Sequence, residues 1–188
     1  MRARMALYQA QMQVEIYEVD LKHKPEEMLK LSPKGLVPVL LLDDGSVIDE
    51  SLEVMRWALE QNDPAGWLLQ KSELARALIT ENDSSFKQAL DRYKYPQRFP
   101  EENCSRARDQ ALLFIERLNA SLKGNPYLSG SQAGFADIAI FPFIRQFANV
   151  DMTWFNSLPM EPVQLWLVSL VESTEFNWIM QKQRTLLL

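Results

Sequence analysis

The sequence predicts an α/β unit at the start of the chain and an all-helical unit after it. Two observations carry this prediction. Segments with period-two alternation or hairpin signals occur only before Pro64, where they alternate with helical segments. After Pro64 every long segment has helical periodicity. We therefore expect two domains, at residues 1–63 and 64–188.

The first unit opens inside a helix. An apolar stripe recurs at helical spacing and consists of Met1, Met5, Tyr8 and Met12. The opposite face is polar and carries Arg2, Arg4, Gln9 and Gln13. Residues 14–21 then alternate between two faces, which predicts a strand.

The rest of the first unit predicts a short helix, a hairpin and a longer helix. Pro25 begins the short helix, because proline is favoured at the first helical position, and the helix ends near Leu31. The turn residues 43–46 join a strand at 37–42 to a short strand at 47–49. The longer helix begins near Ser51 and ends before Pro64.

In the second unit, proline and glycine residues separate the predicted helices. These helices lie at about 71–93, with an interruption near 82–85, and at about 101–122, 135–148, 162–172 and 176–183.

Composition excludes several classes of protein. Lysine and arginine are scattered and the net charge is −5, so we expect no nucleic-acid partner. No apolar run approaches the roughly 18 residues that span a bilayer, so we expect no membrane insertion. A single cysteine and a single histidine exclude a disulfide framework and a metal cluster of the usual spacing. These features favour a cytoplasmic protein without a metal.

Two segments resemble cytosolic glutathione transferases, and the similarity extends over essentially the whole chain. They read SPKGLVPVLLLDDGSVIDES and LSGSQAGFADIAIFP. The resemblance implies a thioredoxin-like glutathione-binding domain, here lacking its first strand, followed by the family's all-helical domain. It also implies a homodimer, glutathione as co-substrate, and an unidentified electrophile or disulfide as the second substrate.

Val37–Pro38 matches the family's Val-Pro pair. In the family this peptide bond is cis, and the residue before proline turns its backbone N–H and C=O toward the cysteinyl part of glutathione. Taken by itself, an X-Pro pair is more often a trans proline at an edge strand. In this context the resemblance implies that Val37 and Pro38 are glutathione-binding residues.

Glu50–Ser51 matches the family's acidic-Ser pair, which holds the γ-glutamyl end of glutathione. A helix N-terminus offers unpaired N–H groups and partial positive charge to a carboxylate, and the Ser51 hydroxyl donates a further hydrogen bond. The resemblance also implies that Glu50 can pair with the ligand ammonium. The alternative is that Ser51 is an ordinary serine N-cap, and the two roles can coexist.

Other residues have weaker interpretations. Lys34, His23 and Lys24 are candidates for the glycyl carboxylate, although a lysine in a turn is usually only solvated. Asp137 matches the family's capping motif, although Gly134 stands where the family has Ser or Thr, and we interpret Asp137 as structural. The aromatic residues of the second-substrate pocket would include Tyr93, Tyr95, Phe99 and Trp154, although aromatics at helical spacing are more often core.

The family's first strand and catalytic turn have no counterpart in the sequence, so no catalytic residue is assigned. Without that strand, two strand edges of the sheet would lack a partner. We expect a longer native protein with cysteine or serine about four residues before Met1, where a helix N-terminus favours thiolate. The alternative is a degenerate member of the family that compensates for the missing strand in another way. Tyr8 and Cys104 are interpreted as packing residues.

Three functions remain open. The first is a glutathione transferase that favours thiol exchange or reductive deglutathionylation. The second is a noncatalytic binding or assembly module with the same fold. The third is a glutathione carrier or storage protein.

Overall fold

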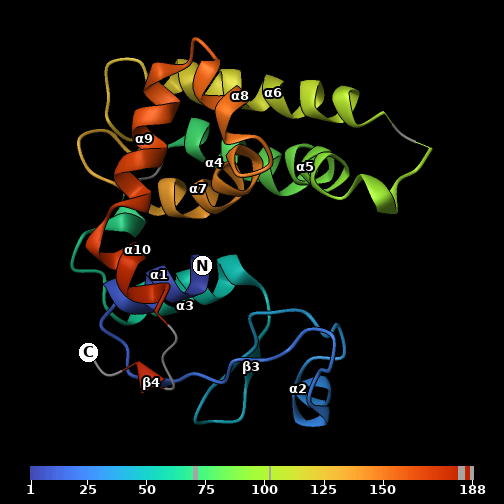
Figure 1. The fold of residues 1–188 in the computed structure, drawn as a ribbon. Helices are drawn as coiled ribbons and strands as arrows, with labels where there is room; N and C mark the ends of the chain where they lie inside the picture. The colour runs from blue at the N-terminus through green and yellow to red at the C-terminus, as the bar shows by residue number, and fades with distance from the viewer. Residues whose placement is uncertain (70–71, 102, 182–184, 187–188) are drawn as a thin grey trace. The chain divides into compact units, whose positions relative to one another are not determined.

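The computed structural model describes residues 1–69, 72–101, 103–181 and 185–186 of the 188-residue chain. Its contacts divide the chain into two compact units, which Figure 1 shows. Unit 1 comprises Met1–Leu68 and Thr174–Leu188, and unit 2 comprises Leu69–Ser173. The end of the chain thus clusters with unit 1. The expected family domains, 1–63 and 64–188, stay a prediction.

Unit 1 contains two separate antiparallel strand pairs. Strand β1 (Val14–Glu15) pairs with β4 (Thr185–Leu186), and β2 (Leu40–Leu41) pairs with β3 (Val47–Ile48). The predicted hairpin is confirmed, with Leu40 opposite Ile48 and Leu41 opposite Val47, although its first strand is shorter than the predicted 37–42.

Two strand predictions were wrong. The predicted strand at 14–21 is regular only at Val14–Glu15. The part after Pro64 was expected to be wholly helical, yet it contains β4. Strand β4 supplies backbone hydrogen-bonding groups to β1, so β1 has a partner strand from the end of the chain.

The described part of unit 1 contains four α-helices, of which α3 and α10 pack against α1. They are α1 (Arg2–Gln9), α2 (Glu26–Leu31), α3 (Ser51–Gln61) and α10 (Thr174–Ile179), with a short 3₁₀ turn η1 (Trp67–Leu69) at the boundary between the units. Helix α1 contacts both α3 and α10. The prediction of α2 and α3 is confirmed.

Arg2 is a correction to the predicted polar face of α1. Its exposed fraction is only 6%, and Ala3, Met5, Ala6 and Leu7 beside it are also buried. The reason is that α3 and α10 both cover α1, so a single apolar stripe underestimates how much of this helix is buried. Arg4 donates to the C=O of Ile179 in α10 at 3.4 Å, which adds a polar contact between these helices.

The regular elements in the described residues of unit 2 are all helical, apart from an isolated antiparallel bridge between Tyr127 and Gly130. Its elements are α4 (Glu73–Glu81), the π-helical turn η2 (Asn82–Phe86), α5 (Lys87–Lys94), the 3₁₀ turn η3 (Pro96–Arg98), α6 (Cys104–Ser121), α7 (Phe135–Ala148), α8 (Met152–Ser157) and α9 (Glu161–Val171). The expected interruption near 82–85 is η2, and α8 was not predicted. The predicted ends at Lys71 and at 182–183 lie outside the described residues.

A buried acidic side chain joins three segments of unit 2. Asp137 is 0% exposed; its Oδ2 accepts from the N–H of Gly134 at 3.0 Å, and its Oδ1 accepts from the N–H of Leu128 and from Nε1 of Trp166, both at 2.8 Å. Burial raises the pKa of the Asp137 carboxyl, and the hydrogen bonds from Trp166 and the backbone oppose that rise. The contact with the Gly134 N–H is the helix-capping contact, which confirms the interpretation of Asp137 as a structural residue.

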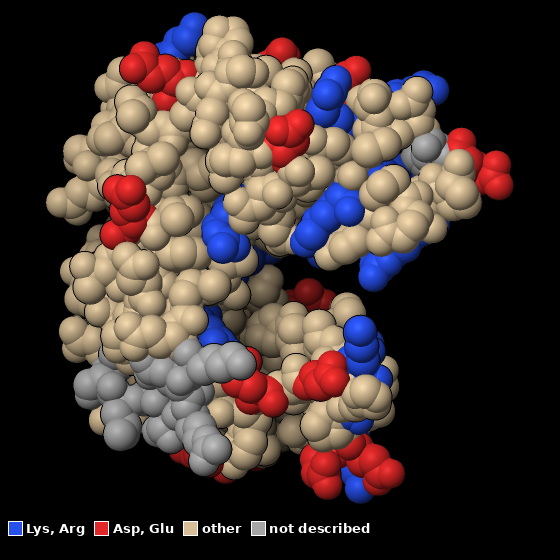
Figure 2. All heavy atoms as spheres, viewed as in Figure 1, with Lys and Arg blue, Asp and Glu red and all other residues tan. Residues whose placement is uncertain are grey.

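The described residues contain no helix that is both long and apolar enough to cross a membrane. Within the same ranges, no group of three or more His, Cys, Asp or Glu side chains could hold a metal ion. On the face that Figure 2 shows, acidic and basic side chains are interspersed.

Candidate functional site

The segment before β2 presents backbone groups to solvent. The Val37–Pro38 peptide bond is cis, and Val37 is 50% exposed. Within the described part of the chain, neither the N–H nor the C=O of Val37 has a hydrogen-bond partner. Gly35, with φ of +59°, turns the chain just before this segment, which is a conformation that favours glycine. Val37 can therefore pair with an extended ligand through its backbone.

The start of α3 differs in one respect from the expectation. Glu50 is the N-cap and Ser51 is the first helical residue, so the interpretation of Ser51 as a serine N-cap was wrong. The N–H of Val54 donates to the C=O of Glu50 at 2.9 Å, which closes the first turn. The N–H groups before it have no partner within the helix and carry the positive end of its dipole. They form a place where a carboxylate can bind.

Arg2 is a site residue that the sequence reasoning missed. Its Nη1 donates to Oγ of Ser51 at 3.4 Å, and its guanidinium is nearly buried. A buried cation beside the positive end of α3 strengthens attraction for a carboxylate. The first turn of α1 carries two arginines, Arg2 and Arg4, and no local pattern in the sequence distinguishes the buried Arg2 from Arg4.

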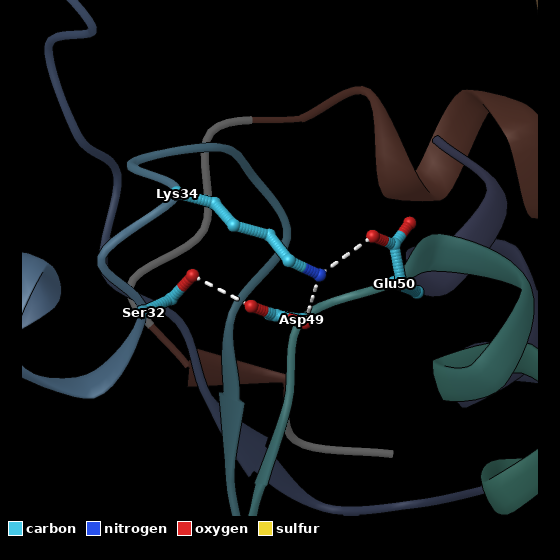
Figure 3. Close-up of polar contacts among 4 residues, drawn as sticks. All are labelled: Ser32, Lys34, Asp49 and Glu50. Carbon is cyan, nitrogen blue, oxygen red and sulfur yellow. Dashed lines mark hydrogen bonds and ion pairs between the residues drawn. The ribbon is translucent and has the colours of Figure 1, made fainter.

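A charged cluster lies beside this helix start, and Figure 3 shows its four residues. Lys34 Nζ contacts Oδ1 of Asp49 at 2.9 Å and Oε1 of Glu50 at 2.8 Å. Oγ of the buried Ser32 donates to Oδ2 of Asp49 at 2.7 Å. Hydrogen bonds to Glu50 and Asp49 raise the pKa of Lys34, and those from Ser32 and Lys34 lower the pKa of Asp49.

These contacts join the two segments that are predicted to bind glutathione, Val37–Pro38 and Glu50–Ser51. Ser32 and Lys34 belong to the loop that leads to Val37, whereas Asp49 and Glu50 lead into α3. The arrangement offers a helix N-terminus with a hydroxyl and a guanidinium for a carboxylate, and the Glu50 carboxylate for an ammonium. It is therefore complementary to a ligand whose carboxylate and ammonium lie on one carbon.

Two of the three other predicted polar candidates, Lys34 and His23, have partners within the protein. Lys34 is engaged by Asp49 and Glu50, and His23 Nδ1 lies 2.8 Å from Oδ2 of Asp20. The proposed role of Lys34, His23 and Lys24 in binding a glycyl carboxylate stays a prediction.

The residues interpreted as packing residues make packing contacts. The Tyr8 ring centroid lies 4.8 Å from that of Trp178. Cys104 Sγ donates to the C=O of Tyr93 at 3.5 Å and is half-buried. The Tyr93 ring contacts Phe147 at 5.2 Å, and Phe147 also contacts Trp154 at 6.0 Å. Tyr93 and Trp154 thus contribute to the aromatic packing of unit 2.

Comparison with known proteins gives the family. The family model described as the glutathione S-transferase N-terminal domain matches residues 1–61, and the one described as the C-terminal domain matches residues 79–167. Glutathione S-transferase 1 of Dianthus caryophyllus is 32% identical over 156 residues, which cover 76% of this chain and 70% of that protein. The chain therefore belongs to the glutathione S-transferase family.

Solved structures share the fold at lower identity. The bacterial glutathione S-transferase BphK, solved as a ternary complex, has a TM-score of 0.77 at 21% identity, covering 95% of this chain and 92% of that chain. A sphingomonad glutathione S-transferase complexed with glutathione has a TM-score of 0.73 at 19% identity, covering 95% and 91%. The chain thus combines a thioredoxin-like N-terminal domain with the family's helical C-terminal domain.

Proposed function

We propose that this chain binds glutathione through unit 1. The backbone of Val37, beside Pro38, pairs with the cysteinyl part of the ligand. Glu50 accepts from the ligand ammonium, and Ser51 with the first turn of α3 binds the γ-glutamyl carboxylate. The observation that carries this proposal is the start of α3, where a free helix N-terminus, the Ser51 hydroxyl and the buried Arg2 guanidinium lie together.

We further propose that the protein is a cytoplasmic, homodimeric transferase that acts on glutathione and an electrophile or disulfide. In disulfide reduction, the thiolate sulfur of glutathione attacks one sulfur, the S–S bond breaks, and the other sulfur leaves as a thiolate that takes up a proton. The residues of unit 1 hold and orient the glutathione. Neither Cys104 nor Tyr8 is assigned a catalytic role, because both are engaged in packing contacts.

The alternative proposal is a noncatalytic binding or assembly module with the same fold. No feature of unit 2 described above specifically favours an assembly role. This alternative therefore rests on the fold alone. A glutathione carrier is the intermediate case, in which binding occurs without turnover.

Two assays separate these functions. Isothermal titration with glutathione measures binding, and reduction of 2-hydroxyethyl disulfide with glutathione measures turnover. Binding together with turnover supports the transferase, and binding without turnover supports the carrier. If neither binding nor turnover were observed, the proposed function would be contradicted and the assembly module would be favoured.

Light scattering at micromolar concentration tests the proposed homodimer. A monomer would contradict that part of the proposal.

A further inference from the structure

Lys34 joins the two segments of the proposed glutathione site. It lies three positions before Val37, and its Nζ reaches both Asp49 and Glu50, as Figure 3 shows. The lysine side chain is about half exposed, at 49%, so a single contact would hardly restrict its conformation. Two contacts from adjacent carboxylates restrict it more, because both must break before the side chain is released.

Asp49 is the more buried and more fully hydrogen-bonded of the two carboxylates in this cluster. Its side chain is 23% exposed, compared with 58% for Glu50. One of its oxygens is held by the hydroxyl of Ser32, a residue that is 1% exposed, and the other by Lys34. Asp49 is thus bound on both oxygens, and it holds Lys34 in place for Glu50.

Glu50 remains available on one oxygen. Its Oε1 contacts Lys34, whereas among the described residues its Oε2 has no hydrogen-bond partner and no dashed line reaches it in Figure 3. The cluster combines two carboxylates with one ammonium, so it keeps a net negative charge. A second ammonium, supplied by a ligand, can therefore bind to the free oxygen of Glu50.

We propose that Lys34 is a positioning residue that orients the Glu50 carboxylate toward the ligand ammonium and so makes the site select thiols with a free α-amino group. The proposal rests on the proposed function, because it concerns the same site. It differs from a simple surface ion pair, which would affect stability slightly and ligand selectivity not at all. It also differs from competition, in which Lys34 would occupy Glu50 and weaken ligand binding.

The test compares two ligands that differ only at the amino group. They are glutathione and its desamino analogue, γ-glutaryl-cysteinyl-glycine, and the quantity is the ratio of their dissociation constants in isothermal titration of the full chain. Measurement in 0.5 M NaCl, where the Debye length is about 4 Å, screens the long-range effect of changing net charge. In the wild type we expect glutathione to bind about 10-fold more tightly or better, because Glu50 gains a charge-assisted hydrogen bond.

Four single variants and one double variant locate the source of that selectivity. Glu50→Gln should reduce the ratio to nearly 1. Lys34→Met should reduce it by about 2- to 5-fold, entirely through weaker glutathione binding. Asp49→Asn should also reduce the ratio. The double variant Lys34→Met/Asp49→Asn should reduce the ratio no further than the stronger of its two single variants, since both changes act through the orientation of Glu50. Lys34→Arg should keep most of the selectivity.

Lys30→Met is the matched control, because Lys30 is an exposed lysine of α2 in the same unit. It makes the same charge change and should leave the ratio unaltered. An unchanged ratio in Lys34→Met would overturn the positioning role, and tighter glutathione binding in that variant would replace it with competition. If the wild type bound no glutathione, the proposed function would fail and this inference with it, which is a distinguishable result.

Discussion

Asp137 in unit 2 and Glu50 in unit 1 are both acidic residues at the start of a helix, yet their surroundings differ. Asp137 is fully buried, and both of its oxygens accept hydrogen bonds from the protein. The side chain of Glu50 is 58% exposed, and only one of its oxygens is engaged, by Lys34.

The difference in burial and hydrogen bonding distinguishes a carboxylate that stabilises the fold from one that can bind a ligand. A buried carboxylate must have its hydrogen bonds satisfied within the protein, since an unsatisfied buried group costs free energy. A carboxylate that keeps an oxygen free can do so only where water, or a ligand that displaces water, completes its hydrogen bonds. Asp137 therefore stabilises unit 2, whereas Glu50 is available to a ligand of unit 1.

The largest expected effect is on stability when Asp137 is replaced. Asp137→Ala leaves the N–H groups of Gly134 and Leu128 and the indole N–H of Trp166 without their acceptor. We expect the free energy of unfolding to fall by about 3 to 5 kcal/mol, measured by urea unfolding. Asp137→Asn keeps one acceptor oxygen and should lose about half as much.

Asp109→Ala is the control for this prediction, because the Asp109 side chain is 63% exposed and lies in the same unit. It should change the free energy of unfolding by less than about 0.5 kcal/mol. Equal effects of the Asp137 and Asp109 variants would contradict the structural role of Asp137.

Two serines at helix starts extend the comparison to ligand affinity. Ser51 is the first residue of α3, whereas Ser72 is the N-cap of α4 and accepts from the N–H of Ala75 at 3.3 Å. Ser51→Ala should weaken glutathione binding by about 1.5 to 3 kcal/mol, because it removes a hydrogen bond to a charged group. Ser72→Ala should cost about 1 kcal/mol of stability and leave glutathione affinity unchanged.

Titration calorimetry and thermal unfolding of both serine variants check these two outcomes. If Ser51→Ala lowered Tm strongly and bound glutathione as well as the wild type does, Ser51 would be a structural residue and the proposed carboxylate site would be lost.

The smallest expected effect is the pH dependence of the contribution that Asp49 makes to protein stability. The hydrogen bond from Ser32 and the contact with Lys34 lower the pKa of Asp49 below its unfolded value of about 3.9. This contribution to stability is therefore present above about pH 4 and is lost as pH falls through the lower folded pKa. The Tm difference between the wild type and Asp49→Asn should be positive at pH 7 and shrink below about pH 4. A difference independent of pH would contradict this account.

Local sequence patterns predicted most helices well. The helix over Phe135–Ala148 and the helix beginning at Ser51 have strong periodicity and clear boundaries, and both occur as expected. The interruption near residues 82–85 is a π-helical turn, which a break in a periodic pattern can locate but cannot identify. The pairing of β1 with β4 was not predictable, because it joins residues at opposite ends of the chain.

The proposed site was predictable only where a motif marks it. Val37, Pro38, Glu50 and Ser51 were found through the resemblance. Arg2 was missed because its burial depends on α3 and α10, which contact α1 from distant parts of the sequence. The Lys34 contacts likewise need the loop before β2 to fold against the start of α3, and no local spacing shows this.

The most direct test of the glutathione site is the backbone amide spectrum of ¹⁵N-labelled protein, recorded by NMR during titration with glutathione. We expect the largest shifts at the N–H groups of Val37, Ser51 and Leu52, since these lie in the exposed segment before β2 and in the first turn of α3. The N–H groups of Leu128 and Gly134, which are bound to Asp137, should shift little. Saturable shifts that left Val37 and Ser51 unchanged and were concentrated in unit 2 would contradict the proposed site.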